Sequence, residues 1–373
     1  MTKLAHFSPS QAIKGRGSSS NERSRFEAWR REAVYDDQFE DQFDDQCENQ
    51  ADGEERPKPK TTVWIQQAKS IISTNQSPDL PFDASINPYQ GCEHGCIYCY
   101  ARPSHAYLGL SPGLDFETKL FAKENAAQLL ESELSSKRYI PKVIVLGANT
   151  DPYQPIEREM KITRAILEVL ERFNHPLSIT TKSGLVTRDI DILERMARKN
   201  LARVHISVTS LQNEVARTLE PRAAAPARRL STIRRLTDAG IPVGVLVAPV
   251  IPAITDVELE AIVESAAAAG ATSAAYILLR LPREVEDLFS EWLQTHYPLR
   301  AKHVLSLLSQ MRGGKAYDAA FGSRMTGTGI FADLLRNRFR LVCLKSGINA
   351  ARTILRTDLF APPCNTLQLN LFE

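Results

Sequence analysis

Residues 177–209 read LSITTKSGLVTRDIDILERMARKNLARVHISVT, and this stretch decides the fold class. Residues 177–181 and 203–209 are short runs of mostly β-branched and apolar side chains, which is typical of buried strands. Between them, residues 187–200 carry apolar side chains at helical spacing and predict an amphipathic helix. Two such strands joined through a helix are typically parallel, with the helix covering one face of their sheet.

The same alternation continues on both sides of this unit. Further strands are expected at 83–87, 142–147, 242–251 and 272–281, and further helices at 157–173, 227–240, 256–270 and onward to about 340. Gly240 and Gly270 are the expected ends of two of these helices. Six strand–helix units predict an α/β protein with a partial (β/α)6 TIM-like barrel over 61–285 and a helical C-terminal extension over 286–373. In such barrels the chemistry lies at the carboxyl ends of the strands.

Residues 1–60 have a different composition from the rest of the chain. A polar, Gly- and Ser-rich segment is followed by residues 27–56, which contain twelve acidic residues and three arginines. Such a segment cannot bury enough apolar surface to offset the entropy lost on ordering. We therefore expect a mostly disordered acidic tail over 1–60.

The bulk composition is that of a soluble globular protein, with 43% hydrophobic and 24% charged residues and a formal net charge of +2. No run approaches the ~20 apolar residues that span a bilayer, and the N-terminus lacks the apolar core of a signal peptide. Six cysteines in 373 residues do not suggest a disulfide scaffold. We therefore expect a cytoplasmic protein with no membrane partner.

Three of the six cysteines lie together in GCEHGCIYCYARP, residues 91–103. Cys92, Cys96 and Cys99 have the spacing C-x3-C-x2-C, and thiolates select zinc, copper(I) or iron–sulfur clusters. A structural zinc ion would need a fourth ligand, which His94 or His105 could supply in a Cys3His site. A [4Fe–4S] cluster held by three cysteines would instead leave one iron open to another ligand. Alternatively, both histidines are hydrogen-bonded surface residues.

The loop and its setting resemble the radical S-adenosylmethionine (SAM) superfamily, whose signature is this spacing with an aromatic residue before the last cysteine. More narrowly, INPYQGCEHGCIYCYARPSHAYLG (86–109) and LGANTDPYQPIE (146–157) resemble the subgroup related to spore photoproduct lyase. The front segment KGRGSSSNERSRFE (14–27) resembles a bacterial branch of that subgroup.

This resemblance implies a [4Fe–4S] cluster on Cys92, Cys96 and Cys99, with SAM on the open iron. It also implies an electron donor such as flavodoxin or ferredoxin. Reductive cleavage of SAM would give a 5′-deoxyadenosyl radical that abstracts hydrogen from a substrate, with the protein supplying orientation and exclusion of water. Tyr98 would pack beside the cluster and shield it.

The resemblance further implies that SAM is contacted from successive strand ends. The expected contacts are Asn149, Thr150 and Asp151 with the amino group, Lys182 with the carboxylate, Ser207 or Thr209 with the ribose, Glu220 and Arg222 nearby, and Val250 and Ile251 with the adenine. Each has a structural alternative. Asn149 to Asp151 could form a simple strand-end turn, Lys182 could be an ordinary surface lysine, Glu220 and Arg222 could form an interhelical ion pair, and Val250 and Ile251 could be barrel core.

The catalytic residue that controls the substrate radical is not identified by any motif. Spore photoproduct lyase has a cysteine at the end of the second strand, where this sequence has GANTD (147–151) and no thiol. Thymine-dimer reversal by the same route is therefore not expected, and the substrate stays open. Nucleic acid is one candidate, because residues 331–356 form a basic helical stretch, although a capping helix would have the same pattern. A zinc-containing nucleic-acid-binding protein and an iron–sulfur redox protein without SAM turnover are the alternative functions.

Overall fold

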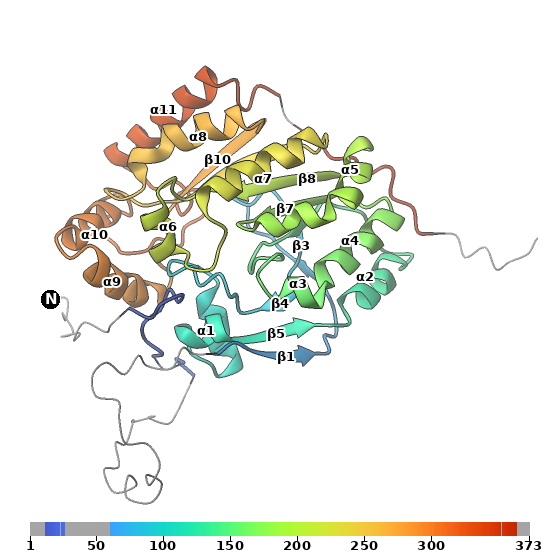
Figure 1. Ribbon diagram of the computed structural model, residues 1–373, viewed down its shortest axis with the longest axis horizontal. Coiled ribbons are helices and arrows are strands. Elements are labelled where there is room, and N and C mark those ends of the chain that lie inside the picture. The colour runs from blue at the N-terminus through green and yellow to red at the C-terminus, as the bar shows by residue number, and fades with distance from the viewer. Residues whose placement is uncertain (1–11, 23, 27–59, 352, 364–373) are drawn as a thin grey trace, which may run out of the picture.

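The computed structural model describes residues 12–22, 24–26, 60–351 and 353–363. Its centre is a seven-stranded sheet with the order β10-β9-β8-β7-β6-β3-β2 (Figure 1). The six parallel strands of this sheet follow one another in chain order: β3 (Ala84–Ile86), β6 (Ile144–Leu146), β7 (Leu177–Thr181), β8 (Ala202–Ser207), β9 (Val243–Val250) and β10 (Ser273–Leu278). At one edge β2 (Ile72–Thr74) pairs antiparallel with β3. The predicted α/β fold with six parallel strands in a partial barrel is thus confirmed.

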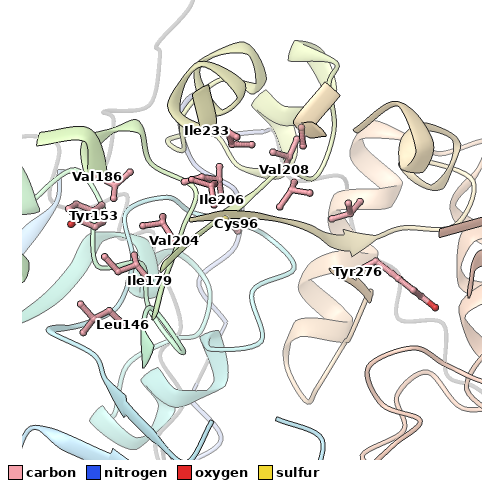
Figure 2. Close-up of a cluster of buried hydrophobic side chains, with 14 of the residues drawn as sticks. Cys96, Leu146, Tyr153, Ile179, Val186, Val204, Ile206, Val208, Ile233 and Tyr276 are labelled. Atoms are coloured by element: carbon pink, nitrogen blue, oxygen red, sulfur yellow. The ribbon is translucent and has the colours of Figure 1, made fainter. Parts of the chain in front are cut away.

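The parallel strands are buried because their sequences are continuously apolar rather than alternating. Pairing places Ile179 of β7 beside Val204 of β8, and Val204 in turn beside Val243 of β9. Figure 2 shows part of the resulting core, in which side chains from neighbouring strands lie among those of the surrounding helices. Cys96 is a member of this core, so the cysteine loop is anchored to the sheet.

Helices connect the strands and cover the sheet. The connecting helices are η2 (Arg102–Leu108), α1 (Leu114–Thr118), α2 (Ala126–Leu134), α3 (Glu157–Met160), α4 (Ile162–Arg172), η3 (Gly184–Asp189), α5 (Ile190–Arg198), α6 (Asn213–Leu219), α7 (Pro226–Asp238), η4 (Asp256–Glu258) and α8 (Leu259–Ala268). In space, α4 packs against both α2 and α5, and α7 packs against α8. Gly240 and Gly270 adopt positive φ angles of 74° and 101° just beyond α7 and α8, which confirms both predicted helix ends.

The single helix expected over 157–173 is wrong, because the chain breaks between α3 and α4 at Lys161, which has a φ of 52°. The buried carboxylate of Glu157 accepts a hydrogen bond from the backbone N–H of Thr163 at 3.0 Å. The first N–H groups of a helix have no partner within the helix. Glu157 supplies a hydrogen-bond acceptor for one of these N–H groups of α4. The break therefore lets a side chain from α3 cap the next helix.

A second, three-stranded sheet was not anticipated from the sequence. It has the order β1-β5-β4 and consists of β1 (Thr62–Gln66), β5 (Lys119–Lys123) and β4 (Tyr89–Gln90). Trp64 and Phe121 stack on it with ring centroids 5.2 Å apart. Two of its strands, β4 and β5, follow β3 in the chain, and β4 leads directly into the cysteine loop.

The C-terminal extension contains α9 (Val285–His296), α10 (Ala301–Gln310) and α11 (Ile330–Lys345). Helix α11 lies along α8 (Figure 1), and Arg338 and Lys345 form ion pairs with Glu260 and Glu264 of α8 at 2.7 and 2.9 Å. The basic stretch therefore acts as a covering helix whose charges are partly compensated. Within the described part of the chain, no helix has both the length and the apolar character required to cross a bilayer.

Candidate functional site

The cysteine loop lies at the carboxyl end of the central sheet and is folded back on itself. The backbone N–H of Cys92 donates to the carbonyl of Phe116 at 2.9 Å, and that of Cys99 donates to the carbonyl of Cys96 at 3.2 Å. Cys92 and Cys96 are each 7% exposed, and all three thiols line one cavity of about 200 Å³. The loop thus gathers three soft ligands around a shared space, as the spacing predicted.

A buried ion pair stabilises the cysteine loop. The guanidinium of Arg102 donates to the backbone carbonyls of Cys96 and Gly95 at 2.9 and 3.1 Å, and it pairs with the carboxylate of Glu117. Neither charged side chain is exposed. A planar guanidinium with several fixed donors can tie together carbonyls from different turns, so Arg102 fixes the loop without occupying the cavity.

The chain's front segment lies over the other side of the loop. We name residues 12–22 and 24–26 the N-terminal strap. The backbone N–H groups of Gly17 and Ser18 donate to the two oxygens of Glu117 at 3.0 and 2.9 Å. A Cβ at Gly17 would lie only 1.8 Å from the carbonyl oxygen of Gly95, so this close approach requires glycine. These strap residues are the part of the expected 1–60 tail that the structure places against the loop; residues 1–11, 23 and 27–59 lie outside the described residues.

The three thiols are better suited to bind a metal centre than to remain free. Burial raises the pKa of each of Cys92, Cys96 and Cys99 above its ordinary value. A bound metal reverses this effect, because coordination deprotonates a thiol. Three free, clustered thiols in a cavity that polar side chains also line fit the donor set of a three-cysteine iron–sulfur cluster.

Neither histidine near the loop is at the surface, which corrects our expectation for them. His94 is 2% exposed, and its Nδ1 lies 3.3 Å from Oδ2 of Asp151. His105 is 1% exposed, its Nε2 lies 2.9 Å from the carbonyl oxygen of Lys119, and burial lowers its pKa to about 4. Among the described residues no group of three or more His, Cys, Asp and Glu side chains is arranged to hold a single metal ion. The geometry therefore gives no support to the Cys3His alternative.

Polar side chains from the next strand ends face the same cavity. Asp151, after β6, accepts hydrogen bonds from the Thr181 hydroxyl at 2.7 Å and from the Lys182 backbone N–H at 2.8 Å. Burial acts to raise the pKa of Asp151, but His94 and these hydrogen bonds outweigh it and lower the pKa below its ordinary value. The carboxylate is therefore charged at neutral pH and ties the ends of β6 and β7 to the cysteine loop.

Lys182 connects the third and fourth strands. Its Nζ donates to the Ser207 hydroxyl at 2.6 Å and lies 3.4 Å from a carboxylate oxygen of the buried Glu220. Glu220 also pairs with Arg229 and accepts from the Tyr98 hydroxyl. Burial acts to raise the pKa of Glu220, but Arg229 and Lys182 outweigh it and lower the pKa. The site therefore holds a charged network directly behind Tyr98.

The structure sorts the expected SAM contacts into two groups. Those that line the cavity with the three cysteines are Tyr98, Asn149, Asp151, Lys182 and Ser207. Those placed elsewhere are Thr150, Thr209, Glu220, Arg222, Val250 and Ile251. Of these, Thr150 donates to the carbonyl of Tyr89 at 2.7 Å, and Val250 and Ile251 are fully buried core, which matches their structural alternatives. Arg222 pairs with Glu93 at 3.0 Å rather than with Glu220.

Several residues of the cavity wall were missed from the sequence. Tyr100 follows Cys99 and lines the cavity, and its hydroxyl donates to the carbonyl of Ala148. The Arg280 guanidinium lies 5.2 Å from the centre of the Tyr100 ring, at the carboxyl end of β10. The signal for Arg280 was available, since it is the one charged residue of the predicted strand 272–281 and lies near its carboxyl end. Tyr100 carried a weaker signal, its position in the cysteine loop.

The family model described as the radical SAM superfamily matches residues 86–266, which contain all three cysteines, Asp151, Lys182 and Ser207. An uncharacterised protein of Mycobacterium tuberculosis is 37% identical over 221 residues, which are 59% of this chain and 65% of that protein. A second relative, an uncharacterised protein of Methanocaldococcus jannaschii, is 29% identical over 192 residues, 52% of this chain and 69% of that protein. The chain thus spans less than two thirds of the mycobacterial relative.

Solved structures share the fold. Spore photoproduct lyase complexed with dinucleoside spore photoproduct superposes with a TM-score of 0.55 at 17% identity, covering 77% of this chain and 80% of that one. A variant of that lyase with bound AdoMet and the same dinucleoside superposes with a TM-score of 0.53 over the same shares. At this identity the likeness is one of fold. The family match runs across the cysteine loop and the following strand ends, so residues 86–266 of this chain are similar to the radical SAM superfamily.

Proposed function

We propose that the protein is a radical SAM enzyme that binds a [4Fe–4S] cluster through Cys92, Cys96 and Cys99 and binds SAM beside it. When bound, the cluster would supply one electron to cleave SAM, giving the 5′-deoxyadenosyl radical that abstracts hydrogen from the substrate. The observation that carries the proposal is the shared cavity, in which the buried thiols of Cys92 and Cys96 and the half-buried thiol of Cys99 face polar side chains from the ends of β6, β7 and β8. The solved lyase with AdoMet bound has the same fold and supports it.

The chain's own residues would bind and orient SAM. The charged Asp151 offers oxygen acceptors that suit an ammonium group. The Lys182 ammonium, which lies between Ser207 and Glu220, is a single cation that suits a carboxylate. The two charges belong to adjacent strand ends, so an amino acid moiety with both groups would be held in one orientation. Tyr98 and Tyr100 would limit access of water to the thiols.

The test is electron paramagnetic resonance of anaerobically purified protein, reduced with dithionite and recorded with and without SAM. A [4Fe–4S]+ signal that changes on addition of SAM is the expected result. The matched variants are Cys96→Ala, which should lose bound iron and sulfide, and Cys343→Ala, which alters a buried thiol on α11 and should retain both. A cluster signal indifferent to SAM would favour a redox centre, and stoichiometric zinc without iron would contradict the proposal.

We further propose that the electron comes from a small donor such as flavodoxin or ferredoxin and that the protein works in the cytoplasm, where thiols stay reduced. The missing thiol at the end of β6 still separates this chain from spore photoproduct lyase. That position holds Gly147, Ala148 and Asn149, and among the described cysteines the remaining one, Cys343, lies on α11 away from the cavity. The substrate is therefore proposed to differ from that of the lyase.

A further inference from the structure

A second cavity, of about 430 Å³, lies beside the first and is lined by arginines. Its walls come from α3, η3, the loop after Glu220, and α7. The arginines that line it are Arg158, Arg188, Arg222, Arg228 and Arg235. Among the described residues that line this cavity there is no aspartate or glutamate. A concave site with one sign of charge concentrates ions of the opposite sign.

Two of these arginines are already compensated by carboxylates behind the wall. Arg188 pairs with Glu157 and Asp189 at 2.7 and 2.9 Å, and Arg222 pairs with Glu93 at 3.0 Å. These pairs hold their side chains in place and leave further guanidinium donors available, because arginine has five.

The other three arginines carry uncompensated charge. Arg158, Arg228 and Arg235 are exposed, and within the described ranges none of them has a carboxylate within ion-pair distance. Arg228 and Arg235 are seven residues apart on α7, so they lie on one face of that helix two turns apart. Gly184 leaves room for Arg228, since a Cβ there would lie 3.0 Å from its Nε. The three unpaired arginine side chains repel one another electrostatically unless an anion binds between them.

The arginine-lined cavity adjoins the thiol-lined one. His94 lines both cavities. The backbone N–H of Arg222 donates to the carbonyl of His94 at 3.3 Å, and that of Ala224 donates to the carbonyl of Lys182, also at 3.3 Å. On α7, Arg229 points inward to Glu220 while its neighbour Arg228 lines the outer cavity. A group bound among the arginines would therefore lie next to the proposed reaction site.

We propose that this cavity binds phosphate groups and that it positions a phosphate-bearing substrate beside the radical site. That the bound group is a substrate rests on the proposed function. That the cavity binds phosphate does not. Guanidinium groups bind phosphate through two parallel hydrogen bonds, and three uncompensated arginines suit a polyphosphate or two neighbouring phosphodiesters. The phosphates belong either to a polynucleotide or to a small phosphorylated compound, and the two sources are separable by experiment.

The test compares the wild-type holoprotein with the triple variant Arg158→Ala/Arg228→Ala/Arg235→Ala. Affinity is measured by fluorescence anisotropy with a labelled single-stranded oligonucleotide and by calorimetry with pyrophosphate. We expect the triple variant to lose about tenfold or more in affinity for the probe that binds, because charge-assisted hydrogen bonds are removed. For an oligonucleotide, the slope of log affinity against log salt should fall by about 2, as expected for three lost phosphate contacts on a single strand.

A matched control has the same loss of charge at exposed arginines that line neither cavity, namely Arg138→Ala/Arg217→Ala/Arg340→Ala. If the cavity variant loses oligonucleotide binding and the control variant does not, the ligand is a polynucleotide. If the cavity variant loses only pyrophosphate binding, the ligand is a small phosphorylated compound. Equal affinity of both triple variants, or no binding of either probe by the wild type, overturns the phosphate site. The SAM-dependent resonance change, recorded on the same samples, reports on the proposed function separately.

Discussion

Arg102 and Glu117 form an ion pair at 2.5 Å in which neither side chain is exposed to solvent. The pair joins three separate parts of the chain. Arg102 binds the carbonyls of the cysteine loop, and Glu117 receives the backbone N–H groups of the N-terminal strap. A buried charge is tolerated only when it is paired and its remaining donors or acceptors are satisfied, and here the loop and the strap satisfy them.

Replacing Arg102 with methionine should lower the free energy of unfolding by about 3–5 kcal/mol, because it leaves the Glu117 carboxylate buried without its cation. Iron content should fall as well, since the loop carbonyls lose their donor. Chemical denaturation followed by circular dichroism, together with iron analysis, measures both. Lys142→Met is the control: it breaks an exposed pair with Asp83 and should cost about 1 kcal/mol or less. Equal costs for the two variants would contradict the bracing role.

Replacing Gly17 with alanine should separate the strap from the cysteine loop, because the new Cβ would lie 1.8 Å from the carbonyl oxygen of Gly95. We expect iron and sulfide per chain to fall at least about twofold and the cluster to be lost faster on exposure to air. Lys14→Ala changes an exposed residue of the same strap and should leave both quantities as in the wild type. If Gly17→Ala retains full iron and the same rate of loss, the strap does not protect the cluster.

Replacing Lys182 with methionine should weaken SAM binding by about tenfold or more, because the proposed partner of the SAM carboxylate is removed. The readout is the SAM concentration that gives half of the resonance change in the reduced protein. Lys123→Met removes another partly buried lysine, on β5, and should leave that concentration unchanged. An unchanged value for Lys182→Met would show that Lys182 serves only the network with Ser207 and Glu220.

His175 should make the fold less stable in mild acid. Burial lowers the pKa of this histidine from 6.5 to about 4. Between these values the unfolded chain binds a proton that the folded chain does not, so the free energy of unfolding decreases as the pH falls from 6.5 towards 4. The full shift corresponds to about 3 kcal/mol. His175→Phe, which keeps an aromatic ring beside Tyr139 and Phe360, should lose this part of the decrease.

Urea denaturation at several pH values measures that slope. The control is His303→Phe, which changes an exposed histidine on α10 and should follow the wild-type slope. A His175→Phe protein with an undiminished slope would contradict the assignment.

The order of the parallel strands could be predicted because each of them is a continuous apolar run between amphipathic helices. The small sheet could not, because β4 has only two residues and β1 has an exposed, mixed pattern. The break at Lys161 was hidden for a different reason. No glycine or proline interrupts residues 157–172, and the capping contact between Glu157 and Thr163 exists only once the chain has turned.

The candidate site, like the fold, could be predicted only in part from the sequence. Cys92, Cys96 and Cys99 are close in the sequence, so their spacing alone placed them in one cavity. Asp151 and Lys182 line the same cavity, and both could be placed near it because each lies in the segment that follows a recognisable strand. Burial of His94 depends on packing against Asp151, and the placement of Arg222 depends on Glu93. Neither partner is near in the sequence to the residue it holds, so no local pattern reports the contact.

The contact between the strap and Glu117 bears on where this protein can be shortened. The family match begins at residue 86, and the first strand begins at Thr62. A fragment cut at residue 86 would lose most of β3, whereas one cut at Thr62 would keep every cysteine of the loop and every strand of the barrel. It would nevertheless leave Glu117 without two of its donors and remove the backbone that lies over Gly95. The smallest unit that retains a covered cysteine loop therefore begins before Gly17, well ahead of the recognisable domain.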